Sequence, residues 1–404
     1  MMNSSVIEKI DKLGLCLGCG LCESVCGKDA VEMELREDGF IHPKIKKVIP
    51  EKEAIINRIC PGTNVINDID FEPNESVWGH VDKLWSGFVT DTEVRTKGSS
   101  GGIVSALGIY ALRTGLVDGV MQVGGDANDY ERNSLRVSYT REDVVKCASS
   151  RYAPAHIFTE IFNILDKDKQ TYLFIGKPCD ISALKNFLNE FPQYKDRFKL
   201  TVSIICAGMP SFNGTAAIIN EFDAEYPVKD LVYRGNGWPG YFSFKDKKEK
   251  LYRKTYNDSW GKVLNRHLKL RCKLCPDGIG IQADIAVGDA WETTDGYPDF
   301  AEKDGQSLII SRTSVGSTIL RQAESDQFVV LADLAVAKIK LMQPYQFNRR
   351  TRLGARLFAF YLRKGVSLNY KNLAIYGNMS YSKPISLLKE FKGTYTRLKK
   401  RRNA

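Results

Sequence analysis

From Val81 onward, short apolar runs alternate with stretches in which apolar residues recur at helical spacing. The first kind of segment predicts strands and the second predicts helices. The predicted strands are residues 83–90, 118–124, 135–140, 171–176, 198–208 and 283–287. The predicted helices are residues 100–115, 155–167 and 180–191. Strands and helices that alternate at this rhythm favour an α/β body.

The segments on either side of this body have different patterns. Residues 28–45 are predicted to form a turn, a strand and a second turn. Residues 67–80 are polar, contain a proline and several turn formers, and are predicted to be a linker. We therefore expect a mixed α+β and α/β chain with an N-terminal module at 1–66, a linker at 67–80, a body at 81–344 and a basic helical tail at 345–404.

Composition and the chain start indicate a cytoplasmic globular protein. The chain is 43% hydrophobic and 26% charged, as is usual for globular proteins. No apolar run approaches the roughly 18 residues of a transmembrane helix. The first residues, "MMNSSVIEKIDKLG", lack both a basic region and a long apolar stretch, so we expect no signal peptide. Only four scattered histidines are available for Cys2His2 zinc sites or Ser-His-Asp catalysis: His42, His80, His156 and His267.

Ten cysteines without a secretory signal suggest metal binding or redox chemistry rather than disulfides. Four of them, Cys16, Cys19, Cys22 and Cys26, have C-x2-C-x2-C-x3-C spacing, which is the bacterial ferredoxin pattern for a [4Fe-4S] cluster. In that pattern a distant Cys-Pro closes the first cluster, and Cys60 is followed by a proline. A second CxxCxxC run before Cys60 is missing, so the N-terminal module is predicted to be ferredoxin-like with one cluster.

The fourth ligand of this cluster is open between two residues. We expect Cys16, Cys19 and Cys22 to be joined by Cys60, and Cys26 is then either the fourth ligand instead or an unused thiol. A zinc knuckle, or thiols without a redox role, is the alternative interpretation of the whole set.

A second set of cysteines is spread over the body. Cys179 and Cys206 each follow an apolar strand, and the carboxyl ends of such strands converge at one edge of an α/β sheet. Cys272 and Cys275 form a CxxC that could complete four thiolates. A buried pair beside a redox-active CxxC explains the same spacing equally well.

A glycine-rich turn, "TKGSSGG", precedes the helix predicted from Ile103. Backbone N–H groups and hydroxyls at a helix N-terminus form a natural phosphate or pyrophosphate site, to which a lysine adds positive charge. The candidate residues are Lys97, Ser99, Ser100, Gly101 and Gly102. A tight turn with serine caps is the alternative, and no G-x-G-x-x-G is present to indicate an ordinary Rossmann site.

Several segments occur in an order that resembles the β-subunit family of coenzyme F420 hydrogenases and dehydrogenases. They are "TKGSSGGIVSALGIYALRTGLVDGVM", "SSRYAP", "TYLFIGKPCDISALK", "IICAGMPS", "YRGNGWPG" and "LRCKLCPDGIGIQADIAVGDAWE". The resemblance extends over roughly residues 10–315. It implies a bound FAD, [4Fe-4S] clusters and electron exchange with an electron carrier, either a ferredoxin or a deazaflavin.

The resemblance also implies roles for particular residues. Cys179, Cys206, Cys272 and Cys275 would bind a second cluster beside the flavin. The glycine-rich turn, "SSRY" and "KPCD" would line the flavin pocket, which adds Ser150, Arg151, Tyr152, Lys177 and Pro178 to the candidates. The expected protein is an iron–sulfur flavoprotein oxidoreductase, and a non-catalytic electron-transfer subunit is the alternative.

The C-terminal tail departs from the family. From Tyr345 to Ala404 there are 15 Lys or Arg and one acidic residue, so this segment carries +14 and the rest of the chain −4. A basic amphipathic helix favours an anionic membrane surface or an acidic protein, which would place the protein at the inner face of the membrane. No recognised nucleic-acid module accompanies the charge, so nucleic acid is the weaker interpretation, and a solvated tail is the simplest. A chain with one N-terminal cluster and a basic C-terminal tail resembles bacterial relatives associated with surface-polysaccharide assembly.

Overall fold

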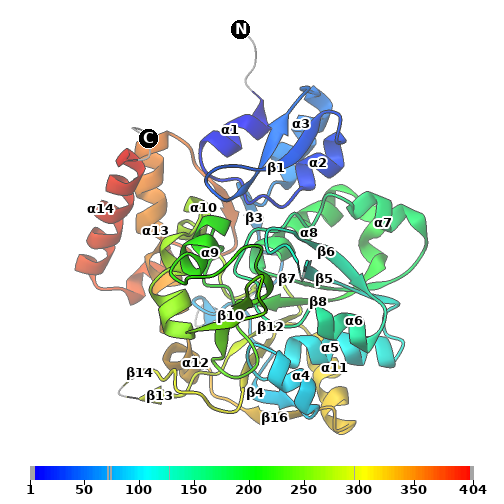
Figure 1. Ribbon diagram of the computed structural model, residues 1–404. Coiled ribbons are helices and arrows are strands. Elements are labelled where there is room, and N and C mark those ends of the chain that lie inside the picture. The colour runs from blue at the N-terminus through cyan, green and yellow to red at the C-terminus, as the bar shows by residue number, and fades with distance from the viewer. Residues whose placement is uncertain (1–4, 71, 73–74, 127, 295, 401–404) are drawn as a thin grey trace.

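The computed structural model describes residues 5–70, 72, 75–126, 128–294 and 296–400. An N-terminal module lies at the top of the molecule in Figure 1, above the main sheet. It consists of α1 (Val6–Lys12), α2 (Leu21–Cys26), the antiparallel hairpin β1 (Val31–Leu35) and β2 (Ile41–Ile45), and α3 (Pro50–Ile59). Here Ser5 caps α1 by accepting a hydrogen bond from the Glu8 N–H.

The body is built on an eight-stranded mixed sheet. Four central strands are parallel neighbours, one edge strand pairs antiparallel to them, and on the other side three strands each pair antiparallel to the strand before. In spatial order the strands are β16 (Val329–Asp333), β4 (Lys83–Val89), β15 (Ser307–Ser311), β12 (Ile285–Asp289), β8 (Phe198–Ile204), β7 (Tyr172–Gly176), β5 (Gly119–Gly125) and β6 (Asn133–Ser138). The α/β body expected from the apolar pattern is confirmed at this level.

Helices cover both faces of the sheet. One face packs against α4 (Thr92–Lys97), α5 (Ile103–Arg113), α6 (Arg141–Lys146) and α11 (Ser314–Ser325). The other face packs against α7 (Ile161–Lys167), α8 (Pro178–Glu190) and α12 (Ala337–Met342). Alternate residues of a strand point to opposite faces; accordingly Leu173 of β7 belongs to the first core and its neighbours Tyr172 and Phe174 to the second.

The N-terminal module shares its apolar core with the body. Leu21 and Ile56 of the module pack in one buried cluster with Ile181 and Leu184 of α8. The segment between module and body is also buried in part, because Val77 and Trp78 join the core under β4 and β15. The region expected to be a plain linker therefore contributes to the packing.

The C-terminal helices lie along the body and the module rather than apart from them (Figure 1). Residues of α13 (Pro344–Lys364) and α14 (Pro384–Lys400) share a core with α1 and α10 (Leu270–Lys273). Between them, β17 (Asn369–Lys371) pairs in parallel with β3 (Asn64–Ile66). Within the described residues, no helix combines the length and apolar character that crossing a membrane requires.

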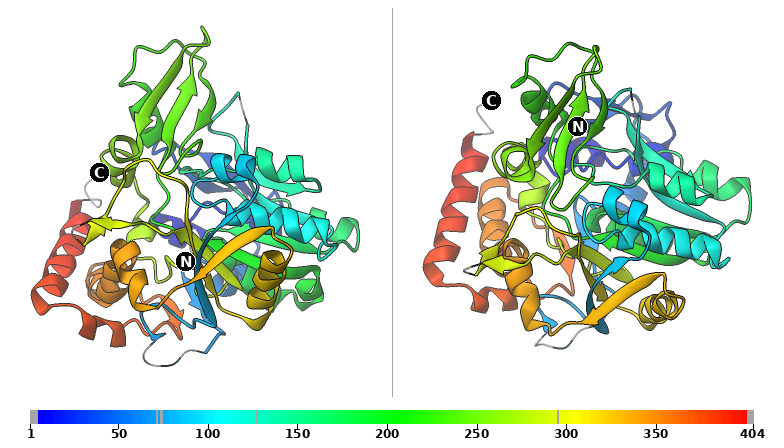
Figure 2. Two further views of the ribbon diagram at one scale, coloured as in Figure 1. Left: turned by 90° about the horizontal axis from the view of Figure 1, so that it is seen from below. Right: turned by 60° about the horizontal axis from the view of Figure 1, so that its bottom comes forward.

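A smaller antiparallel sheet projects from the body, at the top of the left view in Figure 2. It consists of β9 (Lys229–Val232), β10 (Tyr241–Lys245) and β11 (Leu251–Thr255), and it packs on α9 (Phe212–Ile219). A two-stranded ribbon, β13 (Thr293–Thr294) and β14 (Tyr297–Pro298), follows β12. The remaining short turns are η2 (Pro192–Arg197), η3 (Asn257–Gly261), η4 (Leu264–Arg266) and η5 (Gly377–Tyr381).

Candidate functional site: two sets of four thiols

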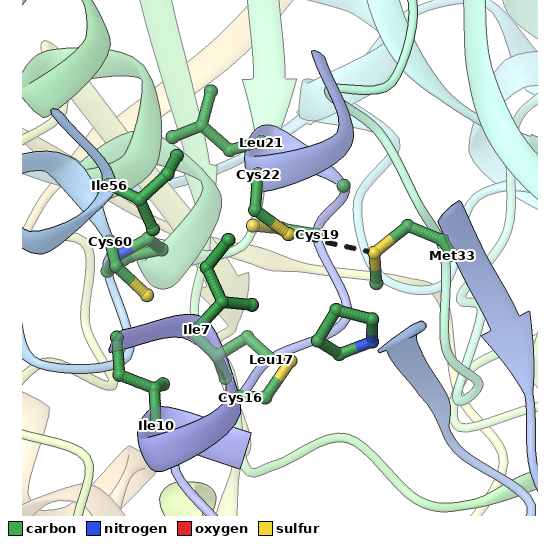
Figure 3. Close-up of a pocket in the computed structure, with 13 residues that line it drawn as sticks. Ile7, Ile10, Cys16, Leu17, Cys19, Leu21, Cys22, Met33, Ile56 and Cys60 are labelled. Atoms are coloured by element: carbon green, nitrogen blue, oxygen red, sulfur yellow. Dashed lines mark hydrogen bonds between the residues drawn. The ribbon is translucent and has the colours of Figure 1, made fainter. Parts of the chain in front are cut away.

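Four cysteines of the N-terminal module line one cavity. Figure 3 shows the side chains of Cys16, Cys19, Cys22 and Cys60 directed toward a shared space, to which Met33 also points. The cavity has a volume of about 430 Å³, part of which is open to solvent. The first three cysteines come from the loop between α1 and α2 and from α2 itself, and Cys60 ends α3.

Two glycines let this loop pack tightly. Gly18 and Gly20 have φ values of +69° and +85°, in the left-handed region that favours glycine. A Cβ on Gly18 would lie 2.7 Å from the Ile41 carbonyl oxygen, and one on Gly20 would lie 2.6 Å from a methyl carbon of Thr159. The Phe158 N–H donates to the Cys19 carbonyl oxygen at 2.9 Å, so the loop is also attached to the body.

Cys26 lies away from this cavity. It is the last residue of α2, it is absent from the cavity lining, and the charges that act on it most are those of Glu53 and Lys52. Of the two candidates for the fourth position, the structure brings Cys60 to the other three thiols.

Burial keeps these thiols protonated in the absence of a metal. Burial, together with the charge of Cys16, raises the pKa of the Cys60 thiol to about 11. Burial raises the pKa of the Cys19 thiol further than that of Cys60. Reactive cysteines have a lowered pKa instead. Buried thiols of this kind become thiolates when they coordinate a metal.

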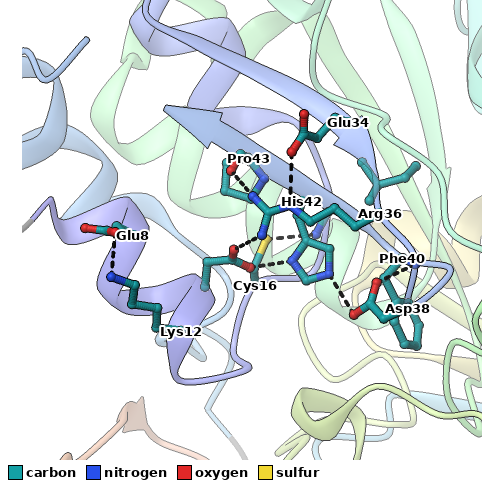
Figure 4. Close-up of polar contacts among 12 residues, drawn as sticks. Glu8, Lys12, Cys16, Glu34, Arg36, Asp38, Phe40, His42 and Pro43 are labelled. Atoms are coloured by element: carbon teal, nitrogen blue, oxygen red, sulfur yellow. Dashed lines mark hydrogen bonds and ion pairs between the residues drawn. The ribbon is translucent and has the colours of Figure 1, made fainter. Parts of the chain in front are cut away.

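A polar network supports the outside of the first site (Figure 4). The His42 ring lies between two carboxylates, with Nδ1 2.5 Å from Asp11 and Nε2 3.0 Å from Asp38. Arg36 donates to Asp11 at 2.9 Å and to the Pro43 carbonyl oxygen at 2.8 Å. These contacts join α1 to the β1–β2 hairpin and so fix the two walls of the cavity.

The four cysteines of the second set line another cavity, of about 340 Å³ and also partly open to solvent. Cys179 lies in the first turn of α8, just after β7, and Cys206 lies two residues after the neighbouring parallel strand β8. Cys272 in α10 and Cys275 complete the set. The convergence predicted from the ends of the two strands is observed.

Positive side chains surround the second cavity. Lys177, Arg271 and Arg349 line it together with one acidic residue, Asp277. Burial by itself lowers the pKa of Lys177, but the charges of Asp180 and Cys179 outweigh burial and raise it. The Lys177 Nζ lies 2.6 Å from an Asp180 carboxylate oxygen, so this pair is internally neutral.

One residue connects the two cysteine sites. Arg271, which is 1% exposed, donates to the carbonyl oxygens of Gly62 at 2.7 Å and Pro61 at 2.8 Å, directly after Cys60. Its own neighbour in the chain is Cys272, and Leu17 lines both cavities. The two sites are therefore adjacent in space although they come from distant parts of the chain.

No three His, Cys, Asp or Glu side chains among the described residues converge on the position of one metal ion. The thiols of each set instead stand around a wider space. A four-sulfur donor set fits an iron–sulfur cluster. The remaining cysteine, Cys147, is in neither set and lies beside Gly124 at the end of α6.

The glycine-rich turn is held by internal contacts. The Ser99 hydroxyl donates to the Arg234 carbonyl oxygen at 3.2 Å, and the Ser100 hydroxyl lies 2.8 Å from that of Ser307. A Cβ on Gly101 would come within 2.4 Å of the Gly87 carbonyl oxygen, and Gly102 has a φ of +75°. These glycines are required by the packing of the protein itself, which is the alternative interpretation of the turn.

The N-terminus of α5 still offers donors. The backbone N–H groups of Gly102, Ile103 and Val104 have no acceptor among the described residues. Lys97 pairs with Glu93 at 3.0 Å on the surface of α4. An anion at this helix end would meet free N–H groups and the positive end of the helix dipole.

The other flavin candidates occupy two places. The Ser150 N–H donates to the Arg234 carbonyl oxygen at 3.3 Å, next to the glycine-rich turn. The Arg151 guanidinium has a buried Nε with no hydrogen-bond partner among the described residues, and the Tyr152 ring packs 4.6 Å from that of Trp260. Lys177 and Pro178 instead line the second cysteine cavity.

The "GDAWE" and "NGWPG" segments meet in a buried group that supports this region. Asp289 accepts hydrogen bonds from Arg234 at 2.6 and 2.8 Å and from the Trp238 ring N–H at 2.8 Å. Trp238 stacks on Trp291 at 4.8 Å. Asp284 accepts hydrogen bonds from the Thr201 backbone N–H at 2.8 Å and from its hydroxyl at 2.6 Å. Both carboxylates have structural partners.

Sequence reasoning missed Arg271, Asp277 and Arg349. Arg271 directly precedes Cys272 and Asp277 lies two residues after Cys275, so proximity to the CxxC was the signal that could have identified them. Arg349 belongs to a basic run that was interpreted as a surface, and no local pattern distinguishes it from its exposed neighbours.

Two adjacent four-thiol sites, one on a small module and one at the edge of a mixed sheet, define a thiol-rich α/β protein. The chain belongs to the coenzyme F420 hydrogenase/dehydrogenase beta subunit family. Residues 84–161 match the N-terminal part of "Coenzyme F420 hydrogenase/dehydrogenase, beta subunit", and residues 169–337 match the C-terminal part of the same family. Together the two matches cover more than half of the chain, from β4 to the start of α12.

Two similar proteins come from Methanococcus voltae and Methanocaldococcus jannaschii. Coenzyme F420 hydrogenase subunit beta of Methanococcus voltae is 26% identical over 257 residues, which cover 61% of this chain and 82% of that protein. Coenzyme F420-dependent sulfite reductase of Methanocaldococcus jannaschii is 24% identical over 363 residues, which cover 88% of this chain and 53% of that protein. The chain therefore spans about half the length of the sulfite reductase.

The fold is similar to that of a chain in the F420-reducing [NiFe] hydrogenase complex from Methanosarcina barkeri. The two chains superpose with a TM-score of 0.53 and 21% identity, covering 70% of this chain and 94% of that one.

Proposed function

We propose that this protein is an iron–sulfur flavoprotein oxidoreductase that passes electrons through two [4Fe-4S] clusters to or from FAD. The observation that carries the proposal is the presence of two adjacent cavities, each lined by four thiols. Membership of the F420 hydrogenase/dehydrogenase family supports it.

Each cluster has its own set of ligands in this proposal. Cys16, Cys19, Cys22 and Cys60 hold the first cluster, and Cys179, Cys206, Cys272 and Cys275 hold the second. Such clusters supply one-electron transfer when they are bound. The chain's contribution is to exclude water with apolar walls at the first site, and to supply buried positive charge at the second.

FAD supplies the exchange between one-electron and two-electron chemistry when it is bound. The residues available to it are the free N–H groups of Gly102 to Val104 and the Arg151 guanidinium, whose buried Nε has no partner within the described chain. Ser99 and Ser100 position this end of α5 through their contacts with Arg234 and Ser307. Lys177 and Pro178 line the cavity of the second cluster instead.

The electron partner is a ferredoxin or a deazaflavin of the F420 type. The names of the relatives favour the deazaflavin, since the hydrogenase subunits and the sulfite reductase are all named for coenzyme F420. The alternative substrate is a sugar- or lipid-linked precursor of a surface polysaccharide, with reduced ferredoxin as donor. Incubation of the anaerobic holoprotein with each acceptor and a chemical reductant separates these options.

A non-catalytic electron-transfer subunit is the second candidate function. The relatives named hydrogenase subunit beta favour it, because they are parts of larger enzymes. If the purified holoprotein reduces its acceptor alone, the chain is an enzyme by itself. If turnover requires a second protein, it is a subunit.

The basic C-terminal helices are proposed to contact an anionic membrane surface. Phe358, Tyr361 and Leu362 of α13 and Ile385 and Leu388 of α14 are exposed apolar residues within this positively charged segment. Vesicles with anionic headgroups should bind the full chain in a salt-sensitive way. Equal binding to neutral vesicles, or none to either, would leave an acidic protein partner as the alternative.

Anaerobic purification with cofactor analysis tests the proposal directly. We expect about eight iron, eight sulfide and one FAD per chain, because two clusters contain four iron and four sulfide each. A reproducible value of four iron would remove one of the two sites. Retention of zinc without iron would contradict the proposal.

A further inference from the structure

The two cysteine cavities differ in the charge of their walls. The first is lined by apolar residues and glycine beside its cysteines, with no charged side chain in its lining. The second is lined by three cationic side chains and one carboxylate. The reduced form of a cluster carries one more negative charge than the oxidised form, so nearby buried cations favour reduction.

Arg349 of α13 is the cation that acts on the second site alone. Its guanidinium, which is 2% exposed, donates to the Cys206 carbonyl oxygen at 2.8 Å and forms a second bond to the Ala207 carbonyl oxygen. Among the described residues it has no carboxylate partner. A buried charge without a counterion is costly. The groups whose negative charge would favour the guanidinium most are the Tyr345 hydroxyl, which it contacts at 3.3 Å, and the cysteines Cys275 and Cys206.

The other charges at the second site largely cancel or are shared. Lys177 is paired with Asp180, as described above. The Asp277 carboxylate faces the buried cations Arg312 and Arg350. Arg271 contacts the loop after Cys60 as well as the second set, so it acts on both sites.

Charged and polar groups outside the cavity lining also act on the cysteines of the first site. Lys269 and Asp11 act on Cys16 from outside the cavity with opposite signs. Backbone N–H groups approach a sulfur in each site, from Gly18 to Cys16 at 3.3 Å and from Met209 to Cys272 at 3.4 Å. Lys269 is 4% exposed and forms no ion pair among the described residues, but it lies outside the lining of the first cavity, whereas Arg349 lines the second.

We propose that Arg349 raises the reduction potential of the cluster at the second site above that of the cluster in the N-terminal module. An electron delivered to the module then moves to the second cluster, so that the first is oxidised as the second is reduced by one electron. This inference rests on the proposed function, because it requires both clusters. Arg349 acts on the second cluster through its charge and contacts no reacting atom.

The test is a redox titration of the anaerobic holoprotein, followed by electron paramagnetic resonance. The Cys19→Ser variant removes the first cluster and thereby assigns the remaining signal to the second. Arg349→Gln keeps an N–H donor group on the side chain but removes the charge. We expect it to lower the equilibrium constant for reduction of the second cluster by about tenfold, which corresponds to about 59 mV for one electron. The first cluster should keep its potential.

Two further variants make the measurement specific. Arg349→Lys keeps the charge and should restore most of the shift. Arg352→Gln, one turn further along α13, removes a guanidinium that lies outside the lining of the second cavity and 3.7 Å from Glu390, and should leave both potentials in place. A shift below threefold in Arg349→Gln, or an equal shift in both clusters, would overturn the inference.

The wild-type protein gives an independent check if Arg349→Gln does not fold. Its second cluster must have the higher of the two potentials, and the reverse order would overturn the inference. Absence of a second cluster from the wild type, seen as four iron per chain, would overturn the proposed function as well. Two clusters with no effect of Arg349 would overturn this inference alone.

Discussion

Cys60 and Cys26 differ in their surroundings although sequence spacing allows either to complete the first site. Cys60 faces the cavity together with Cys16, Cys19 and Cys22. Cys26 ends α2 outside the cavity lining, where burial raises the pKa of its thiol to about 11, with a further contribution from Glu53.

This difference predicts opposite outcomes for the two serine variants. Cys60→Ser should remove the N-terminal cluster and leave about four iron per chain, because one thiolate ligand is lost. Cys26→Ser is the matched control and should keep about eight iron and both spectroscopic signals. Iron analysis with electron paramagnetic resonance measures both. Loss of the cluster in Cys26→Ser, with retention in Cys60→Ser, would reverse the assignment.

Arg151 provides the second test at the scale of a single residue. A hydrogen bond to a charged group contributes about 1.5–3 kcal/mol, and about 1.4 kcal/mol corresponds to tenfold in affinity. Arg151→Gln should therefore weaken FAD binding by about tenfold or more, as measured by flavin fluorescence in equilibrium titrations. The exposed neighbour Arg136 offers the control variant Arg136→Gln, which should bind FAD normally. Unchanged affinity in Arg151→Gln would exclude this guanidinium from the flavin site.

The glycine-rich turn is a poor place for the same test. A side chain on Gly101 would collide with the Gly87 carbonyl oxygen. Loss of flavin from such a variant would not separate a binding defect from a folding defect, whereas Arg151 can be shortened without a collision.

At the scale of elements, α13 shows how a basic sequence can belong to the interior. Arg350, on the same helix as Arg349, is 2% exposed and donates to the carbonyl oxygens of Pro276 at 2.5 Å and Ser76 at 2.9 Å. The positive charge that suggested a surface helix is thus used in part to join α13 to the body.

The packing of α13 predicts a large effect of truncating its buried face. Leu353 is 1% exposed, so Leu353→Ala should lower the free energy of unfolding by about 2–5 kcal/mol. Leu362 is 52% exposed on the same helix, and Leu362→Ala should change it by no more than about 0.5 kcal/mol. Denaturant unfolding of the two variants gives the comparison. Equally small changes in the free energy of unfolding of both variants would show that the packing of α13 does not stabilise the fold.

Sequence reasoning predicted elements best where the apolar pattern was long and regular. The strands at 83–90 and 171–176 and the helix at 180–191 match β4, β7 and α8 closely. The helix expected at 155–167 begins only at Ile161, because the preceding residues contact the Cys19 loop instead. Tertiary contacts of this kind have no local signal.

The same limit applies to the candidate site. Spacing and strand ends identified the cysteines that line both cavities, since each has a local pattern. The contacts of Arg271 with Gly62, and of Arg349 with Cys206, join segments about 140 residues or more apart. Such pairings depend on the topology of the sheet and could not be predicted from a single sequence.

At the scale of the whole molecule, the second site depends on distant segments that the sheet brings together. Cys179 and Cys206 follow parallel neighbours. Cys272 in α10 and Cys275 just after it complete the set, so nearly a hundred residues separate the first cysteine from the last. A cluster requires all four thiolates, whereas a redox-active CxxC requires only two. The two interpretations therefore predict different patterns across the same four serine variants.

If the four thiolates share one cluster, each serine variant should lose it and retain about four iron, because each supplies one ligand. Electron flow from the N-terminal cluster to the flavin should stop in all four. Direct chemical reduction of the flavin should survive, since its own pocket is unchanged. A redox CxxC would instead inactivate Cys272→Ser and Cys275→Ser and spare Cys179→Ser and Cys206→Ser. Iron counts beside stopped-flow reduction of the flavin distinguish the two patterns, and an intact second cluster in Cys179→Ser and Cys206→Ser would refute the shared site.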